Sequence, residues 1–398
     1  MKICVVHNAY GKLSGEEVAV QNLSNYMRRK DHSVVEFFRD SASIPDSGLA
    51  KASALFSGIY SFAARREFSN LLDTEKPDLV HVNNLYPLIS TSILDESKRR
   101  RIPTVMTLHN YRLACPTGLM MSRGEICRRC VTGGEWQCVA RNCTGETAKS
   151  VGYALRNWVA RLLGVFHEKV DHFVAPSRFL KSVLVESGYP SDRISVAPYI
   201  LEIPPESADN GDGEYVGYVG RISPEKGVDV IVEAARRLPE IPFKFAGDYA
   251  RMPEVARRAP ANCSFMGAIP HAQLDEFIGK ARFTVVSSVW YEVQPFSLFE
   301  PMSQGKCVVC ADIGSLSEFV EHDRTGMLFK AGAPDDLATK VQHLWDRPAR
   351  CRELGAAARA RVLHEFSPEL AYLKTMNAYD AAIGRAIERP LVAAFQQG

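Results

Sequence analysis

The sequence has no strong excess of charge of either sign, with 48 basic and 46 acidic residues among 398 and a formal net charge of +2. A protein whose main activity is binding nucleic acid usually carries a basic excess, so this balance argues against that class. No apolar run approaches the roughly 18 residues that a membrane span needs. The first six residues enter a strand pattern rather than a leader for secretion. We therefore expect a cytoplasmic protein that binds no nucleic acid.

The sequence also lacks the common glycine-rich nucleotide motifs. The loop after the first expected strand contains Gly11 and Gly15 but no G-x-G-x-x-G, which argues against a dinucleotide-dependent dehydrogenase. No G-x-x-x-x-G-K-[ST] occurs either, which argues against a P-loop kinase or ATPase. Gly15 still suits a close approach of the backbone to a phosphate or sugar, although an ordinary turn glycine is the simpler interpretation.

Basic residues are grouped at positions 28–30, 65–66 and 98–101. The simplest interpretation is that these groups are solvated helix ends, where cations suit the helix dipole. The alternative is attraction to an anionic membrane surface, which would make the protein peripheral to a membrane and favour a lipid-linked acceptor.

The distribution of apolar residues indicates two similar halves. Short β-branched runs alternate with amphipathic stretches over 3–197 and again over 215–329, which predicts two parallel sheets with helices on both faces. A segment rich in proline, glycine and acidic residues separates the halves. We predict an α/β protein with two doubly wound, Rossmann-like lobes facing a cleft. The expected parts are an N-terminal lobe over 1–198, a linker over 199–213, a C-terminal lobe over 214–375, and a helix over 376–398 that returns to the N-terminal lobe.

The second half begins with a strand that ends in glycine, followed by a loop that carries two cations. Gly220 precedes Arg221, and Lys226 precedes Gly227 and a predicted helix. Two cations at the carboxyl end of a strand and beside a helix N-terminus favour a diphosphate site. The other interpretation is a solvated pair of loop charges.

Two glutamates, Glu292 and Glu300, lie eight residues apart after an apolar strand pattern at 283–288. We expect Glu292 in the loop at the end of that strand and Glu300 on a helix that starts near Pro295. Ligands bind at this edge of an open α/β sheet, and two carboxylates there suit sugar hydroxyls on either side of the phosphates. Two glutamates at this spacing also occur by chance, so the interpretation depends on their surroundings.

The order of these motifs resembles the donor lobe of the family 4 retaining glycosyltransferases of the GT-B fold. The first lobe is similar but matches more loosely, at 14–17, at His109 and at 175–177. The motifs of the second lobe are Gly220-Arg221, Lys226-Gly227, Ala246-Gly-Asp248, Phe265-Met-Gly267, Glu292-x7-Glu300, Gly305-x-Cys-Val-Val309 and Gly326-x-Leu-Phe329.

The resemblance implies a retaining hexosyl- or related glycosyltransferase that uses a nucleotide-diphosphate sugar, UDP-linked in the simplest case, as in polysaccharide biosynthesis. The N-terminal lobe would then bind the acceptor, which is a polysaccharide, a glycolipid or a small molecule, and the C-terminal lobe would bind the donor. Arg221 and Lys226 would hold the diphosphate, Glu300 the ribose and Glu292 the transferred sugar. The implied catalytic residues are His109, Glu292, Arg221 and Lys226. The implied donor-binding residues are Gly15, Gly220, Arg221, Lys226, Glu292, Gln294, Pro295, Phe296, Ser297 and Glu300.

Some details stay open at this point. Gln294-Pro295 replaces the Phe-Gly that is frequent in the family, which leaves the sugar pocket undetermined. A histidine such as His109 is often only a hydrogen-bonded core residue. No catalytic metal is expected, because cations and a helix N-terminus stabilise the developing charge. The alternatives are another GT-B enzyme, such as a sugar-nucleotide epimerase or a phosphorylase, and a non-enzymatic binding module.

Half of the ten cysteines fall between residues 115 and 143. Cys127 and Cys130 form a C-x2-C pair, the usual knuckle of a tetrahedral metal site. We predict a structural zinc or iron at Cys115, Cys127, Cys130 and Cys143, with Cys138 in reserve. Free thiols or a redox pair are the alternatives. A closed site of four thiolates leaves no open coordination position for chemistry, so its role would be to organise this insert on the acceptor side.

Overall fold

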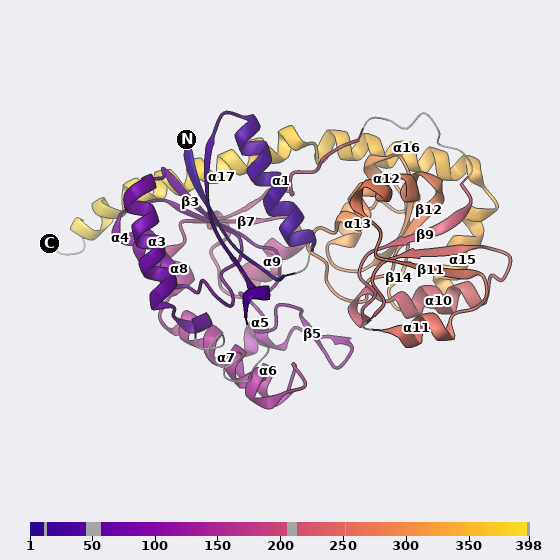
Figure 1. Cartoon of the computed structure of the whole chain (residues 1–398), viewed down its shortest axis with the longest axis horizontal. Helices are drawn as coiled ribbons and strands as arrows, with labels where there is room; N and C mark the ends of the chain where they lie inside the picture. The colour runs from indigo at the N-terminus through magenta and orange to yellow at the C-terminus, as the bar shows by residue number, and fades with distance from the viewer. Residues whose placement is uncertain (12–13, 45–56, 205–212, 251, 396–398) are drawn as a thin grey trace. The chain divides into compact units, whose positions relative to one another are not determined.

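The structure is a computed structural model that describes residues 1–11, 14–44, 57–204, 213–250 and 252–395. Two compact units make up the chain (Figure 1). The linker predicted over 199–213 falls largely on 205–212, outside the described residues. The first unit comprises Met1–Met120, Cys127–Ile200 and Glu369–Gly398, and the second comprises Met121–Ile126 and Leu201–Pro368.

The first unit contains a six-stranded parallel sheet in the order β2-β1-β3-β4-β7-β8. Its strands are β1 (Lys2–Ala9), β2 (Ser33–Asp40), β3 (Leu79–Val82), β4 (Thr104–Thr107), β7 (His172–Ala175) and β8 (Ile194–Val196). Strand β1 pairs with β2 on one side and with β3 on the other. The carboxyl ends of β1 and β3 therefore form a topological switch point, where ligands bind in open α/β sheets.

Helix α1 (Gly15–Arg29) shows how the sequence specifies these elements. The Ser14 side chain caps the helix by accepting from the Glu16 amide, and basic residues occupy the last turn, where they suit the dipole. Leu23 and Met27 are buried on one face. The other helical segments of this part of the chain are η1 (Ser41–Ser43), α3 (Phe62–Glu75), α4 (Ser92–Arg99), α5 (Arg129–Gly133), α6 (Trp136–Ala140), α7 (Thr147–Leu162), α8 (Val165–Lys169), α9 (Arg178–Glu186) and η2 (Ser191–Arg193).

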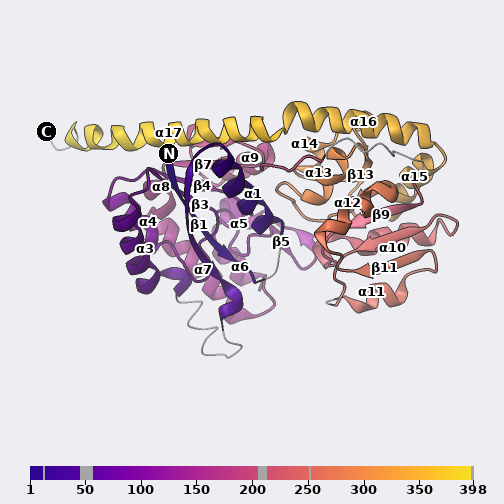
Figure 2. The ribbon, with the colours of Figure 1, turned by 45° about the horizontal axis from the view of Figure 1, so that its top comes forward.

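The C-terminal helix α17 (Pro368–Phe395) belongs to the first unit from Glu369 onward. Figures 1 and 2 show it in yellow, running beside the strands of the first unit. Ala378 and Tyr379 join the buried core that includes Ile3 of β1. The Tyr379 hydroxyl also forms a 2.6 Å hydrogen bond with Nδ1 of His81 on β3. The helix therefore packs on the first unit, and the boundary predicted at 376 lies inside it.

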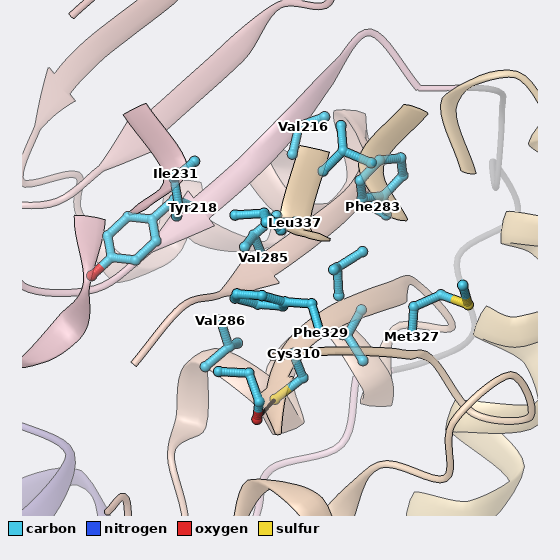
Figure 3. Packing of buried hydrophobic residues seen from close by; sticks show 14 of the residues in the cluster. Val216, Tyr218, Ile231, Phe283, Val285, Val286, Cys310, Met327, Phe329 and Leu337 are labelled. Atoms are coloured by element: carbon cyan, nitrogen blue, oxygen red, sulfur yellow. Dashed lines mark hydrogen bonds between the residues drawn. The ribbon is translucent and has the colours of Figure 1, made fainter. Parts of the chain in front are cut away.

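The second unit repeats the architecture with the strand order β11-β10-β9-β12-β13-β14, all parallel. Its strands are β9 (Tyr215–Val219), β10 (Phe243–Ala246), β11 (Cys263–Gly267), β12 (Ala281–Val286), β13 (Cys307–Asp312) and β14 (Met327–Lys330). Figure 3 shows the core of this unit, where Val216 of β9, Val285 of β12 and Phe329 of β14 pack together. The switch point here lies between β9 and β12.

Helical segments follow most strands of the second unit. They are η3 (Pro224–Lys226), α10 (Val228–Arg236), α11 (Pro253–Arg258), α12 (His271–Lys280), α13 (Phe296–Ser303), α14 (Leu316–Phe319), α15 (Pro334–Trp345) and α16 (Pro348–Glu365). The prediction of an α/β protein with two Rossmann-like lobes is therefore confirmed. No helix in the described part of the chain has the length and apolar character needed to cross a membrane.

Candidate active site

The loop after β9 is held against the loop after β12. Gly227 has a φ of +64°, and a Cβ atom at this position would lie 2.2 Å from the Ser287 carbonyl oxygen. The Ser287 hydroxyl donates to the Lys226 carbonyl at 2.9 Å, and the Val289 amide donates to the Glu225 carbonyl at 3.0 Å. These contacts place Lys226 at the switch point of the second sheet.

Lys226 and Glu292 form a buried ion pair there. The Lys226 Nζ lies 2.6 Å from Glu292 Oε1, and the same oxygen accepts from the Ser288 hydroxyl at 2.6 Å and from the Trp290 indole N–H at 2.9 Å. Glu292 is only 5% exposed. Burial alone would raise the pKa of Glu292, but Lys226 and the hydrogen bonds from Ser288 and Trp290 outweigh it and hold that pKa below its ordinary value. Glu292 is therefore an ionised carboxylate in a nearly dry position.

Arg221 differs from Lys226 in its exposure. Its side chain is 60% exposed and lies 3.5 Å from the Glu225 carboxylate. Its carbonyl accepts a 2.7 Å hydrogen bond from the Tyr218 hydroxyl, which fixes the start of the loop. The preceding Gly220 packs tightly, since a Cβ atom on Gly247 would lie 1.9 Å from the Gly220 carbonyl oxygen. The loop is thus rigid at its base, while the guanidinium faces solvent.

Helix α13 carries the second glutamate of the pair. Gln294 is buried, Pro295 occupies the cap position, and Phe296 and Ser297 begin the helix on which Glu300 lies half-buried. The first turn of a helix leaves amide N–H groups without intrahelical partners, which favours an anion nearby. The structure therefore brings the cation loop, the buried carboxylate and a helix N-terminus to one edge of the second sheet.

In the first unit, both ring nitrogens of His109 are hydrogen-bonded. Nδ1 lies 2.9 Å from the Tyr199 hydroxyl and Nε2 lies 2.9 Å from the Asn83 side-chain oxygen. Because an amide oxygen only accepts, Nε2 carries the proton and Nδ1 accepts from Tyr199. Burial, reinforced by the neighbouring His7 and His81, lowers the pKa of His109 well below its ordinary value. His109 is therefore neutral and fully engaged, and its catalytic role stays a prediction.

A cavity of about 380 Å³, partly open to solvent, lies beside His109 in the first unit. It is lined at the carboxyl ends of β3 and β4, near the switch point of the first sheet. Its lining residues are Asn83, Asn84, Leu85, Tyr86, Met106, Thr107, Leu108, His109, Asn110, Arg112, Leu113, Asn157 and Phe166.

Gly15 opens helix α1 after β1, where its capping residue Ser14 also donates to the Glu17 carboxylate. The Glu17 carboxylate also accepts from the Tyr10 amide at 2.8 Å, which links the start of α1 to the residue after β1. Gly15 and His109 thus belong to the first unit, whereas the other predicted donor-binding residues belong to the second. Nothing in the described residues assigns Gly15 a ligand, so its role also stays a prediction.

The cysteine cluster does not form a metal site in the described structure. No group of three or more cysteine, histidine, aspartate or glutamate side chains among the described residues is arranged to hold a metal ion. A hydrogen bond with Cys130 lowers the pKa of Cys115, and that bond raises the pKa of Cys130. Burial and the neighbouring Cys143 raise the pKa of Cys138 to about 12. The thiol interactions therefore involve Cys138, which we placed in reserve.

The basic groups at 28–30, 65–66 and 98–101 are largely neutralised by local acids. Arg65, Arg99 and Arg100 all bind the buried carboxylate of Glu96. Arg28 pairs with Glu36 at 2.5 Å. These contacts favour the interpretation as paired helix ends over a free basic surface.

Sequence reasoning missed several residues of both sites. Ser288 and Trp290, which share Glu292 with Lys226, directly follow the predicted strand at 283–287 and could have been found from that position. Asn83 and Asn84 follow the strand predicted at 78–82 in the same way. Arg112 had no such signal, because it lies five residues beyond the end of β4 at Thr107, in an irregular segment before the cysteine-rich insert.

Comparison with known proteins covers nearly the whole chain. Residues 13–199 match the family described as Glycosyltransferase Family 4, and residues 200–361 match the family described as Glycosyl transferases group 1. An uncharacterised 42.6 kDa protein in the cps region of Klebsiella pneumoniae is 23% identical over 350 residues, covering 80% of this chain and 87% of that protein.

Solved structures show the same fold. Sucrose-phosphate synthase from Thermosynechococcus elongatus superposes with a TM-score of 0.69 at 17% identity, covering 99% of both chains. HepE of Anabaena, solved in complex with UDP-glucose, superposes with a TM-score of 0.67 at 15% identity, covering 96% of this chain and 100% of that chain.

Proposed function

Because the chain belongs to the family 4 glycosyltransferases of the GT-B fold, we propose that it transfers a sugar from a nucleotide-diphosphate sugar with retention of the anomeric configuration. We propose a UDP-linked hexose or related sugar as the donor, which the second unit binds. The acceptor, a polysaccharide, glycolipid or small molecule, binds the first unit.

The observation that carries this proposal is the buried Lys226–Glu292 pair at the switch point of the second sheet. An ionised carboxylate in a nearly dry position suits the hydroxyl groups of a sugar, because it accepts hydrogen bonds that water does not contest. The exposed guanidinium of Arg221 suits the diphosphate, since it can fork two oxygens. Glu300, one helix turn or more from the start of α13, is the proposed partner of the ribose hydroxyls.

The leaving nucleoside diphosphate develops negative charge as the glycosidic bond to phosphate breaks. We propose that Arg221, Lys226 and the N-terminus of α13 stabilise that charge without a catalytic metal. Lys226 holds two roles in this scheme, since it fixes Glu292 before the donor binds and presents its charge to phosphate afterwards.

A thermal-shift screen with UDP, GDP, ADP and TDP sugars tests the donor. We expect stabilisation by UDP and UDP-sugars, and loss of that shift in Arg221→Ala. Stabilisation by none of the nucleotides would reject the donor site. NMR of the product's anomeric centre then tests retention, and inversion would reject that part. Dependence of turnover on free phosphate would favour a phosphorylase instead.

We keep a structural metal at the cysteine cluster as a separate proposal. The donor set is chemically suited to zinc, because thiolates are its preferred structural ligands. The proposed ligands stay Cys115, Cys127, Cys130 and Cys143, with Cys138 in reserve. Metal analysis of the purified protein decides the matter, and a content well below one equivalent of zinc or iron would reject the proposal.

A further inference from the structure

The cavity of the first unit contains an unusual concentration of hydrogen-bond donors and positive charge. Among its described lining residues are four asparagines, a histidine and Arg112, but no aspartate, glutamate or lysine. Asn83 is only 4% exposed, and its side-chain nitrogen has no hydrogen-bond partner within the described structure. A buried donor without a partner costs free energy unless a ligand or water satisfies it, so this nitrogen points to a missing acceptor.

Arg112 is held in place by neutral groups. Its guanidinium donates to the Asn84 side-chain oxygen at 3.0 Å and to the Tyr10 hydroxyl at 3.2 Å. Its backbone N–H donates to Asn110, and its carbonyl accepts from Asn157 at 2.6 Å. These contacts leave three of the five N–H donors of the guanidinium available, because two of them donate to neutral oxygens in the described structure.

A second arginine, Arg156, lies beside the same cavity and is buried, whereas Arg112 is half-buried. The guanidinium carbon of Arg156 lies 4.2 Å from the centre of the Tyr86 ring, and that of Arg112 lies 5.5 Å from it. Arg156 is 6% exposed and donates to the Pro116 carbonyl and to Asn157. Burial, with the added charge of Arg112, lowers the pKa of Arg156 to about 10. The positive charges of the two arginines near this ring therefore repel each other.

No carboxylate neutralises either arginine in the parts of the chain that the structure describes, since neither takes part in an ion pair within 4.0 Å. Burial lowers the pKa of Arg112, but Tyr10, Glu16 and Tyr86 outweigh it and raise that pKa above its ordinary value, although Glu16 lies beyond ion-pair distance. A buried arginine is usually paired, because the cost of desolvating an isolated charge is high. The missing counterion is most simply supplied by a ligand.

We propose that this cavity binds an anionic group of the acceptor, a carboxylate or a phosphate, through Arg112 and the Asn83 amide. Arg112 is suited to either anion, because its planar fork gives two parallel hydrogen bonds to two oxygens. Only the description of the ligand as an acceptor rests on the proposed function. It assigns the substrate class: an acidic sugar, as in a uronate-containing glycan, or a phosphate-bearing acceptor.

Matched pairs of ligands separate the two sources of the anion. Calorimetry on the full-length protein, with UDP at saturation to occupy the phosphate-binding loop of the second unit, would compare glucuronate with glucose and glucose 1-phosphate with glucose. We expect one charged sugar of these pairs to bind at least about ten-fold more tightly than glucose, because a charge-assisted hydrogen bond contributes about 1.5–3 kcal/mol. Tighter binding of glucuronate identifies a carboxylate as the anion, and tighter binding of glucose 1-phosphate identifies a phosphate.

Variants test the role of Arg112. Arg112→Gln is expected to reduce binding of the preferred anion about ten- to hundred-fold and to leave the weak binding of glucose unchanged. Arg112→Lys keeps the charge but loses the fork, so it should retain part of the preference and the native melting temperature. Arg66→Gln, which removes one exposed positive charge from the same unit, is the control and should bind as wild type. Equal binding of charged and neutral sugars, or an unchanged preference in Arg112→Gln, would overturn the proposal.

The two proposals fail in different ways in this experiment. If UDP stabilises the protein but no anion is preferred, the anion site alone is rejected. If the anion binds in an Arg112-dependent manner while no nucleotide stabilises the protein, the anion site stands and the donor proposal is rejected.

Discussion

Replacing Lys226 by methionine tests whether the Lys226–Glu292 pair organises the second unit before any donor binds. The substitution keeps the length of the side chain and removes its charge. Glu292 then retains the hydrogen bonds from Ser288 and Trp290 but loses its cation in a position that is 5% exposed. Removing one partner of a buried pair costs about 3–5 kcal/mol. Because Ser288 and Trp290 still donate to Glu292, we expect the loss of unfolding free energy to lie near the lower end of this range, about 3 kcal/mol. For a domain of this size, that loss corresponds to a fall of about 6–12 °C in melting temperature.

The pH dependence of the stability of wild type and variant tests the same account of Glu292, because the direction of each change can be predicted. In the wild type the pKa of Glu292 lies below its ordinary value of 4.5, so its contribution is present above that pH and is lost as the pH falls. In Lys226→Met, burial acts with less opposition and raises the pKa of Glu292 above 4.5. The folded variant then binds the proton more tightly than the unfolded chain, so its stability falls as the pH rises through that range. The difference between wild type and variant should therefore widen as the pH rises through and above about 4.5.

Differential scanning fluorimetry across this pH range measures both effects, and two further variants sharpen them. Lys280→Met breaks an ion pair of the same 2.6 Å length with Glu276, but that pair is exposed and screened by solvent, so we expect little change in melting temperature. Adding Glu292→Gln to Lys226→Met removes the unpaired carboxylate and should recover about 1–2 kcal/mol with loss of the pH dependence. A melting temperature of Lys226→Met within a degree or two of the Lys280→Met control, at every pH, would refute this account of Glu292.

Two other substitutions test the loop after β9 and the paired helix ends. Gly227→Ala should destabilise the second unit by at least about 1–3 kcal/mol from its positive φ alone. It should also abolish UDP binding, because the new Cβ atom would displace the loop from Ser287. The control is Gly279→Ala, at a helical position with nothing within 4 Å, which should change neither the melting temperature nor UDP binding. Glu96→Gln should destabilise the first unit by about 2 kcal/mol at neutral pH, because three arginines outweigh burial and hold the pKa of Glu96 at about 2. That contribution is present above the unfolded pKa and is lost as the pH falls toward about 2. The difference in stability between wild type and variant should therefore shrink as the pH is lowered, and a constant difference from neutral pH downward would contradict this account.

The central strands were predictable because they are short apolar runs buried on both faces, as β3 and β4 illustrate, whereas the edge strands β2 and β11 are partly exposed. The helices that sequence reasoning missed, α3 and α7, have amphipathic patterns diluted by polar residues and glycine. Their positions depend on partners far away in the chain, such as the contact of α3 with α4. The return of α17 rests on Tyr379 and His81, which are separated by 298 residues, and no local pattern records that pairing.

The two candidate sites differ in how far the sequence specifies them, and the reason is geometric. The proposed donor residues Arg221, Lys226 and Glu292 lie in the loops that follow β9 and β12, and the rule that neighbouring parallel strands end at one edge places these two loops together. The cation of the first-unit cavity cannot be found in this way. Arg112 reaches the cavity only because Asn110 and Asn157 fix its backbone, and Asn157 comes from α7, a helix with no strand-end signal. We therefore expect the loops at the strand ends to determine the donor, whereas an irregular segment around Arg112 determines the acceptor. Relatives that share the sheet edges can therefore share a donor class while differing in the acceptor, and Arg112, not Lys226, is the position at which we expect that difference to be decided.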